Sequence, residues 1–193
     1  MSRIILASSS VYRKELLLRL SIEFTTVSPN IDEKKLEFES AYKSAERLAE
    51  EKARKISYQY KDAIVIGCDQ TAEYESKQIQ KPLDYQAAFK QLKELSGKRV
   101  NFHSAICVNY EKKEIFQNKV ISFDVKYKNL DSVEIENYLK KEKPFNCVGS
   151  IKSEGLGISL LDEINSNDPT AIIGLPLITL VSMLKKVGIN ING

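Results

Sequence analysis

The chain has 193 residues, of which 42% are apolar and 28% are charged, and its formal net charge is +3. This composition predicts an ordinary globular protein and excludes an intrinsically disordered chain. The small net charge and the lack of a basic run argue against a nucleic-acid polymer as partner. No apolar stretch approaches the roughly 18 residues that a membrane span needs, so we expect no membrane contact.

Two further features predict a cytoplasmic protein. The N-terminal apolar run, Ile4 to Ala7, is too short for the core of a secretory signal. The three cysteines, Cys68, Cys107 and Cys147, are widely spaced and each lies in an apolar segment, so we expect buried thiols in a reducing compartment.

The first part of the chain shows alternating strand and helix patterns. Residues 3–7 predict a buried strand, residues 11–20 a helix with leucines on one face, and residues 23–29 a β-branched second strand. After an acidic, irregular segment, Ser40 begins a long helix whose apolar face contains Ala41, Ala45, Leu48, Ala49, Ala53 and Ile56. Lys52 lies at the edge of that face.

The middle of the chain predicts one central strand and a long hairpin. Residues 62–74 are continuously apolar until Asp69, which we expect at the end of the buried strand. Residues 75–82 form a hairpin return, and Asp84 caps a helix over 85–95. Residues 99–110 and 114–130 flank a polar turn and predict an antiparallel hairpin.

The last part predicts two more helices. One begins at Asp131 or Ser132 and ends near Lys141, and a glycine-spaced loop over 146–160 then enters a strand. Residues 170–174 predict a short strand. Pro176 suits the start of a helix that Gly188 ends, with an apolar stripe of Leu177, Leu180, Val181, Leu184 and Val187. This order of elements, with its long hairpin, predicts an α/β fold with a mixed sheet and flanking helices.

Three serines, Ser8 to Ser10, join the first strand to the first helix. Backbone N–H groups and hydroxyls at a helix start attract anions, and Arg13 in the first turn adds a fork of donors. The segment therefore suits a phosphate site, and the alternative is a simple helix cap by Ser9 or Ser10 with a solvated arginine.

Two carboxylates and two separate lysines add the other residue types that a site for a polyphosphate and a metal ion needs. Glu33 lies in the acidic loop and Asp69 at the polar end of the strand, while Lys52 and Lys81 are separated cations. Carboxylates hold a hard cation such as Mg²⁺, and cations neutralise phosphate oxygens. The single histidine, His103, alternates with apolar neighbours, so we expect it to face the sheet rather than serve a catalytic triad or a metal.

The ordered motifs LASSSVYRKELL, IDE, LAEEKA, IGCDQ, KP, SGKRV, GSIKSEGLGI and GLPL run from Leu6 to Leu177. Together they resemble the Maf family of nucleoside triphosphate pyrophosphatases, and within it the branch that hydrolyses 7-methyl-GTP. The resemblance spans essentially the whole chain. Val11 departs from it, since proline is usual at that position.

The resemblance implies one domain over residues 1–193, with the two-lobed, inosine-triphosphatase-like architecture and a central cleft. It implies hydrolysis of the α–β phosphate bond of a nucleoside triphosphate, with Mg²⁺ or Mn²⁺ as cofactor. The catalytic aspartate falls on Asp69, which also shares the metal with Glu33. Phosphate-binding residues fall on Ser8, Arg13, Lys52 and Lys81.

The substrate-discriminating positions of the family fall on Tyr12, Gln70 and Glu154, where the dTTP/UTP branch has arginine, threonine and glutamine. The tyrosine face suits the cationic ring of 7-methylguanine, and Glu154 can accept hydrogen bonds from its Watson–Crick edge. Gln70 could orient the substrate or bind the base or sugar. The alternatives are a dTTP/UTP pyrophosphatase and a non-catalytic nucleotide-binding regulator of cell division. A homodimer is the default assembly.

Overall fold

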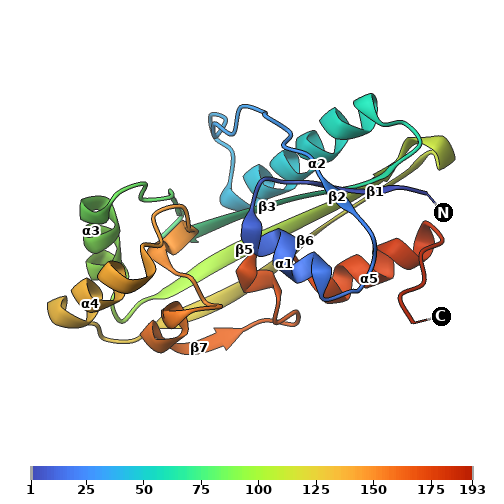
Figure 1. The fold of residues 1–193 in the computed structure, drawn as a ribbon. Coiled ribbons are helices and arrows are strands. Elements are labelled where there is room, and N and C mark those ends of the chain that lie inside the picture. The colour runs from blue at the N-terminus through green and yellow to red at the C-terminus, as the bar shows by residue number, and fades with distance from the viewer. Residues whose placement is uncertain (1, 193) are drawn as a thin grey trace. The chain divides into compact units, whose positions relative to one another are not determined.

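The computed structural model describes residues 2–192, and its seven strands form one mixed sheet with the order β2-β1-β3-β5-β6-β7, to which β4 is added beside β3 (Figure 1). The strands are β1 (Ile4–Ala7), β2 (Thr25–Thr26), β3 (Ile64–Tyr74), β4 (Lys77–Ile79), β5 (Arg99–Tyr110), β6 (Ile115–Tyr127) and β7 (Leu161–Asn165). The helices are α1 (Val11–Leu18), α2 (Ala41–Gln59), α3 (Tyr85–Leu95), α4 (Ser132–Glu142) and α5 (Leu177–Lys186). The predicted α/β fold with a mixed sheet is confirmed.

The chain divides into two compact units. Unit 1 comprises Met1–Gln70, Ser104–Ile121 and Asp168–Gly193, and unit 2 comprises Thr71–His103 and Ser122–Asn167. The assignment of a single domain to residues 1–193 and the central cleft stay predictions.

Unit 1 is built on two parallel strands, β1 and β3, that are buried on both faces, with the short exposed strand β2 at the edge. Strand β1 pairs in parallel with β2 and with β3, and Leu6 lies opposite Ile66 in the register. Ile4 and Leu6 point into one apolar cluster, whereas Ile5 and Ala7 point into another, because successive side chains of a strand alternate between its faces. This explains why the N-terminal strand is a continuous apolar run.

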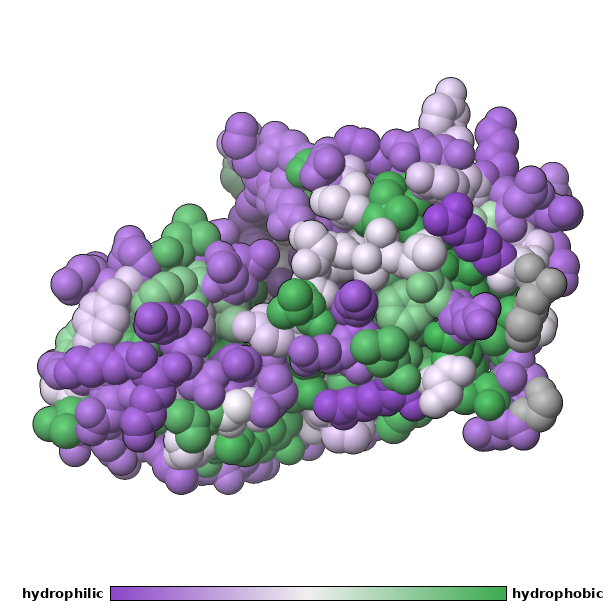
Figure 2. Space-filling model, in the orientation of Figure 1, coloured by the Kyte–Doolittle hydropathy of each residue, from purple (hydrophilic) through white to green (hydrophobic). Residues whose placement is uncertain are grey.

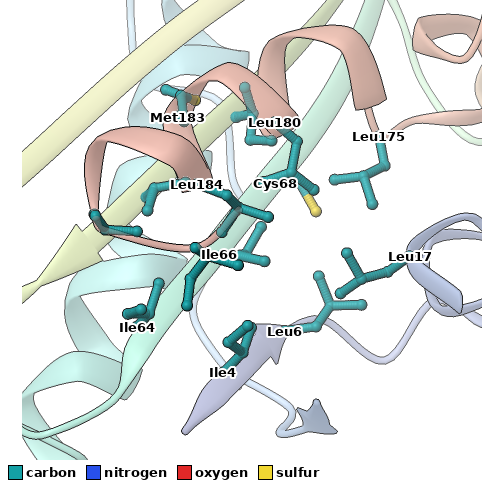
Figure 3. Close-up of a cluster of buried hydrophobic side chains, with 14 of the residues drawn as sticks. Ile4, Leu6, Leu17, Ile64, Ile66, Cys68, Leu175, Leu180, Met183 and Leu184 are labelled. Atoms are coloured by element: carbon teal, nitrogen blue, oxygen red, sulfur yellow. The ribbon is translucent and has the colours of Figure 1, made fainter. Parts of the chain in front are cut away.

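Helices α1 and α5 cover the first of these faces. Figure 3 shows side chains of β1, β3, α1 and α5 pointing toward one another in this cluster, which includes Ile66, Cys68, Leu17 and Leu184. The predicted stripe of α5 is largely confirmed, and Met183, which the stripe omitted, is also buried.

Helix α2 covers the second face, and its backbone lies very close to that of β3. Ser40 caps the helix as predicted, and its alanine-rich face is buried. A Cβ atom placed on Gly67 of β3 would lie 2.2 Å from the carbonyl oxygen of Ala49 and 2.7 Å from the amide of Ala53. Only glycine therefore allows this approach of strand and helix, which brings Lys52 of α2 down to β3.

Unit 2 has its own packing. Phe102 and Phe123 stack with ring centroids 5.5 Å apart, and the hydroxyl of Tyr127 donates to the carbonyl of Gly149. Helix α3 begins at its cap Asp84, as predicted. Helix α4 begins with a complete capping box, in which Asp131 and Glu134 each bond the other's backbone amide.

Several sequence-based boundaries are wrong. Strand β3 does not end at Asp69 but continues to Tyr74, because β4 pairs with residues beyond Asp69 and extends the sheet. Residues 170–174 are not a strand: Ala171–Ile173 form a 3₁₀ turn that ends at Gly174, whose φ of 105° stops an extended chain. The second strand is shortened to Thr25–Thr26.

The surface is mainly hydrophilic on the face seen in Figure 2, with hydrophobic residues in separate patches. Within residues 2–192, every helix is too short or too polar to cross a bilayer. Cys68 and Cys107 are buried as predicted, whereas Cys147 is only half-buried, since it lies in an irregular loop rather than in a strand.

Candidate functional site

Lys52 lies at the centre of a charged cluster in unit 1. Its Nζ lies 2.6 Å from Oδ1 of Asp69 and 2.6 Å from Oε1 of Glu33, and only 4% of the residue is exposed. The three residues come from α2, from β3 and from the segment 27–40. A buried ammonium needs such partners because burial removes its hydration.

The two carboxylates of this cluster differ in their exposure. The Asp69 side chain is 9% exposed, whereas that of Glu33 is 47% exposed. Because both contact the same ammonium, their oxygens lie no more than twice 2.6 Å apart. The structure thus brings together the catalytic and metal residues that the sequence predicted, together with one of the predicted phosphate cations.

The serine turn caps α1 and also contains a hydrogen bond between Ser8 and Ser10. The Ser10 hydroxyl accepts from the Arg13 amide at 3.4 Å and caps α1, while the buried Ser8 hydroxyl accepts from the Ser10 amide at 3.1 Å. The cap that we considered as the simpler explanation is therefore present. It orders the start of the helix, whose backbone N–H groups carry positive partial charge.

Arg13 is fixed by two main-chain carbonyls. Its Nε donates to the Gly174 carbonyl at 3.0 Å and its Nη1 donates to the Cys68 carbonyl at 3.0 Å. Burial alone would lower the pKa of Arg13, but nearby Cys68, Asp69 and Glu33 outweigh it and raise that pKa. Arg13 is thus neither solvated nor randomly oriented, and it shares the electrostatic environment of the carboxylates.

The side-chain amide nitrogen of Gln70 donates its hydrogen bonds to other groups of the protein. Nε2 donates to Ser104 Oγ at 2.9 Å and to the carbonyls of Ala171 and Ile172 at 2.9 and 3.1 Å. The Ser104 hydroxyl, which is fully buried, donates to the Ala171 carbonyl at 2.6 Å. Carbonyl oxygens only accept, so the side-chain orientation is unambiguous. Gln70 therefore ties the 171–173 turn to β3 and has no N–H left for a base or sugar.

The sequence missed Ser104 and the role of Asp168. Ser104 sits in an apolar alternation that gives no polar signal. Asp168 is 2% exposed and accepts from the amides of Ile178 and Thr179 and from Thr170, so it anchors the turn to the first residues of α5. Its place in a polar loop well before Leu177 gave no signal that it would bond the start of α5.

Tyr12 is half-buried in the first turn of α1, in the same unit. The structure therefore places seven of the predicted residues in unit 1: Ser8, Tyr12, Arg13, Glu33, Lys52, Asp69 and Gln70.

Lys81 and Glu154 lie in unit 2, and both are exposed. Although the Glu154 residue is exposed, its surroundings remove part of the hydration of its carboxylate and raise its pKa above the ordinary value, and Lys152 and Ser153 offset this only in part. The functions of both residues stay predictions.

His103 of β5 is buried, as expected for a sheet-facing residue. Its Nδ1 lies 2.8 Å from Ser122 Oγ, and its Nε2 lies 3.6 Å from Glu73 Oε1. Across residues 2–192, no group of three or more histidine, cysteine, aspartate or glutamate side chains is arranged to hold a metal ion.

Comparison with known proteins gives consistent results. Residues 3–187 match the family model described as "Maf-like protein". The chain is 46% identical to a 7-methyl-GTP pyrophosphatase of Methylobacillus flagellatus, covering 99% of this chain and 100% of that protein. It is 43% identical to one of Nitrosospira multiformis, covering 98% and 96%, and 45% identical to one of Burkholderia pseudomallei, covering 99% and 90%.

Among solved structures, the Staphylococcus aureus Ham1 protein matches with a TM-score of 0.36 at 16% identity, covering 65% of this chain and 71% of that one. A likeness at this level does not establish a shared fold. The family match, by contrast, spans nearly the whole sequence, and the three relatives match over 90–100% of their own length. The chain belongs to the Maf family.

Proposed function

We propose that this Maf protein is a nucleoside triphosphate pyrophosphatase that hydrolyses 7-methyl-GTP to 7-methyl-GMP and pyrophosphate and so clears a modified nucleotide. The observation that carries the proposal is the buried contact of Lys52 with Asp69, shared with Glu33. The relatives that match this sequence over nearly their full length carry the name of that activity.

The donor set fits a divalent cation that also binds phosphate. Mg²⁺ is usually held by one or two carboxylates together with substrate phosphates, rather than by an all-protein cage. Asp69 and Glu33 provide two carboxylates around one positive charge, and a third protein ligand is not required. A bound Mg²⁺ or Mn²⁺ would neutralise phosphate charge and make a nearby water easier to deprotonate.

In this proposal Asp69 is the general base. Water cleaves the α–β bond, the proton of the water goes to the Asp69 carboxylate, and pyrophosphate leaves with the bridging oxygen. Burial and the fixed contact with Lys52 hold that carboxylate in one orientation. A positioned base contributes about 10² to 10⁴-fold to a rate.

The cations act on the phosphate groups. The Arg13 guanidinium uses Nε and one N–H of Nη1 for carbonyls, which leaves its other N–H groups for phosphate oxygens. The Lys52 ammonium has three N–H donors, of which two are directed at the carboxylates of Glu33 and Asp69, so one is left for a phosphate oxygen. Both charges stabilise the leaving pyrophosphate. Ser8 and Lys81 are further phosphate ligands by resemblance.

In this proposal Tyr12 and Glu154 select the substrate through direct contact with its base. A tyrosine face attracts a cationic ring by about 0.5–2 kcal/mol. A carboxylate that accepts from the guanine edge adds roughly 1.5–3 kcal/mol. Gln70 contributes indirectly in this proposal, since its amide nitrogen is committed to the 171–173 turn and to Ser104.

The test is a panel of 7-methyl-GTP, GTP, dTTP and UTP with Mg²⁺ or Mn²⁺, in which released pyrophosphate is measured. Fastest turnover of 7-methyl-GTP is expected, and Asp69→Asn should lower kcat at least about 100-fold while nucleotide still binds. Asp62→Asn, which removes an exposed carboxylate of the same unit, is the matched control.

Other outcomes identify the alternatives. Turnover chiefly of dTTP or UTP would refute the substrate assignment and keep the enzyme. Binding without release from any nucleotide would leave a regulatory nucleotide-binding protein. A cytoplasmic location and a homodimer stay predictions.

A further inference from the structure

Segment 27–40 carries Glu33 without any helix or strand of its own. It joins β2 to α2, and its backbone includes two non-glycine residues at positive φ, Asn30 and Phe38. Such a segment needs external attachments to keep a side chain in one place. Lys52 contacts Glu33 and Lys55 donates to the Asn30 carbonyl at 2.6 Å, and the other attachments to α2 converge on one residue outside the charged cluster.

Arg47 of α2 makes these attachments. Its Nε and Nη2 donate to the two carboxylate oxygens of Glu39 at 2.7 and 2.9 Å, and Nη2 also donates to the carbonyl of Lys34 at 3.1 Å. Lys34 directly follows Glu33. The Arg47 side chain is 20% exposed and that of Glu39 is 9% exposed, so water competes weakly for these bonds.

We propose that Arg47 is a positioning residue that clamps segment 27–40 onto α2 and thereby sets the Glu33 carboxylate for the divalent cation. The inference rests on the proposed role of Glu33 as a metal ligand. Arg47 is one helical turn before Glu51 and lies on the same helix as Lys52, so one rigid element holds both the clamp and the ammonium that Glu33 contacts.

Two features support the clamp. Hydrogen bonding from Arg47 is the main cause that lowers the pKa of Glu39, so this carboxylate stays charged and bonded. The Glu39 carboxylate also accepts from the amide of Leu36 at 3.2 Å, which closes the segment on itself between the clamp and Glu33. A planar fork that binds a carboxylate with two parallel bonds is geometrically specific.

Arg47 offers an internal control. Its Nη1 also donates to Glu51 at 3.1 and 3.2 Å, but Glu51 is on the same helix as Arg47 and not part of segment 27–40. Glu39→Ala therefore releases the segment, whereas Glu51→Ala removes a partner of the same guanidinium and leaves the clamp in place. Arg47→Ala removes both.

The experiment measures Mn²⁺ affinity by electron paramagnetic resonance in the presence of α,β-methylene-GTP, which resists cleavage of the α–β bond. Removing a residue that orients a metal ligand typically costs 10- to 100-fold in metal affinity. We expect about this loss for Arg47→Ala and Glu39→Ala, and near wild-type affinity for Glu51→Ala. Tryptic cleavage after Lys34 and Lys35 should accelerate in the same two variants.

Equal affinities in all four proteins, or equal losses in Glu39→Ala and Glu51→Ala, would overturn the proposal. Absence of Mn²⁺ binding by the wild-type protein would overturn it too. These readouts need no turnover. Failure of the nucleotide panel would therefore refute the enzymatic function without deciding whether Arg47 positions Glu33, and the reverse also holds. Thermal melting of each variant identifies any that unfolds, and Arg47→Lys, which keeps the charge without the fork, should recover only part of the affinity.

Discussion

Replacing Lys52 by methionine should destabilise the protein more than any exposed charge removal. The Lys52 side chain is 5% exposed, and its ammonium lies 2.6 Å from the carboxylate of Asp69, whose side chain is 9% exposed. At that separation the attraction is on the order of 6 kcal/mol for an effective dielectric constant of about 20, and desolvation of both groups offsets much of it. Removing one partner leaves the other buried and unpaired, which typically costs about 3–5 kcal/mol.

The assay is a double-mutant cycle of wild type, Lys52→Met, Asp69→Asn and the double variant. The free energy of unfolding of each protein is measured by urea denaturation. Lys52→Met should also lower the melting temperature by about 6–20 °C, at 2–4 °C per kcal/mol for this chain length. Asp69→Asn alone should cost less, because the ammonium keeps Glu33. The double variant should be more stable than the sum of the single effects predicts, by at least about 1.5 kcal/mol.

Additive effects within about 0.5 kcal/mol would refute the reasoning, because they would mean that the buried pair does not couple. Lys43→Met is the control. Lys43 pairs with Glu46 on the same helix, but its side chain is exposed, so its replacement should leave the unfolding midpoint unchanged.

Three further predictions concern packing, the 171–173 turn and the thiols. Gly67→Ala should cost about 1–3 kcal/mol or more in thermal unfolding, because the new Cβ meets the Ala49 carbonyl at 2.2 Å, and an unchanged melting temperature would contradict this close contact. Gln70→Glu cannot donate to its carbonyl acceptors and should cost about 1–3 kcal/mol in urea unfolding, whereas wild-type stability would show that these bonds are dispensable. Burial raises the pKa of Cys107 to about 12, so iodoacetamide at pH 8 should label the half-buried Cys147 first by mass spectrometry, and equal labelling would be inconsistent with this burial.

Periodicity and caps predicted most of the helices because these signals are local. Ser40, Asp84 and Asp131 each cap a helix where expected, and the alanine-rich face of α2 is buried. Strand ends were less predictable. Asp69 looked like the end of a strand because it is polar, but pairing with β4 carries the strand past it, and pairing between separate segments leaves no local mark.

The residues of the candidate site divide in the same way into predictable and unpredictable ones. Ordered motifs identified Glu33, Lys52 and Asp69, which the structure brings into contact. The commitment of Gln70 to a turn 101 residues away could not be predicted, because the partners are main-chain carbonyls and any residue type supplies those. Arg47 was overlooked for a related reason: on a charged helix it resembles any solvated residue until the segment that it holds is seen.

The anchoring of Arg13 has a consequence for how this sequence can vary. Both of its acceptors are main-chain oxygens, those of Cys68 and Gly174. These two hydrogen bonds do not depend on the side chain at position 68, although the Cys68 side chain contributes to the raised pKa of Arg13 and packs into the apolar cluster. Position 174 is different, since φ is 105° and a Cβ would stand 3.3 Å from Arg13 Nε. Divergent copies of this protein should thus exchange the cysteine more readily than the glycine.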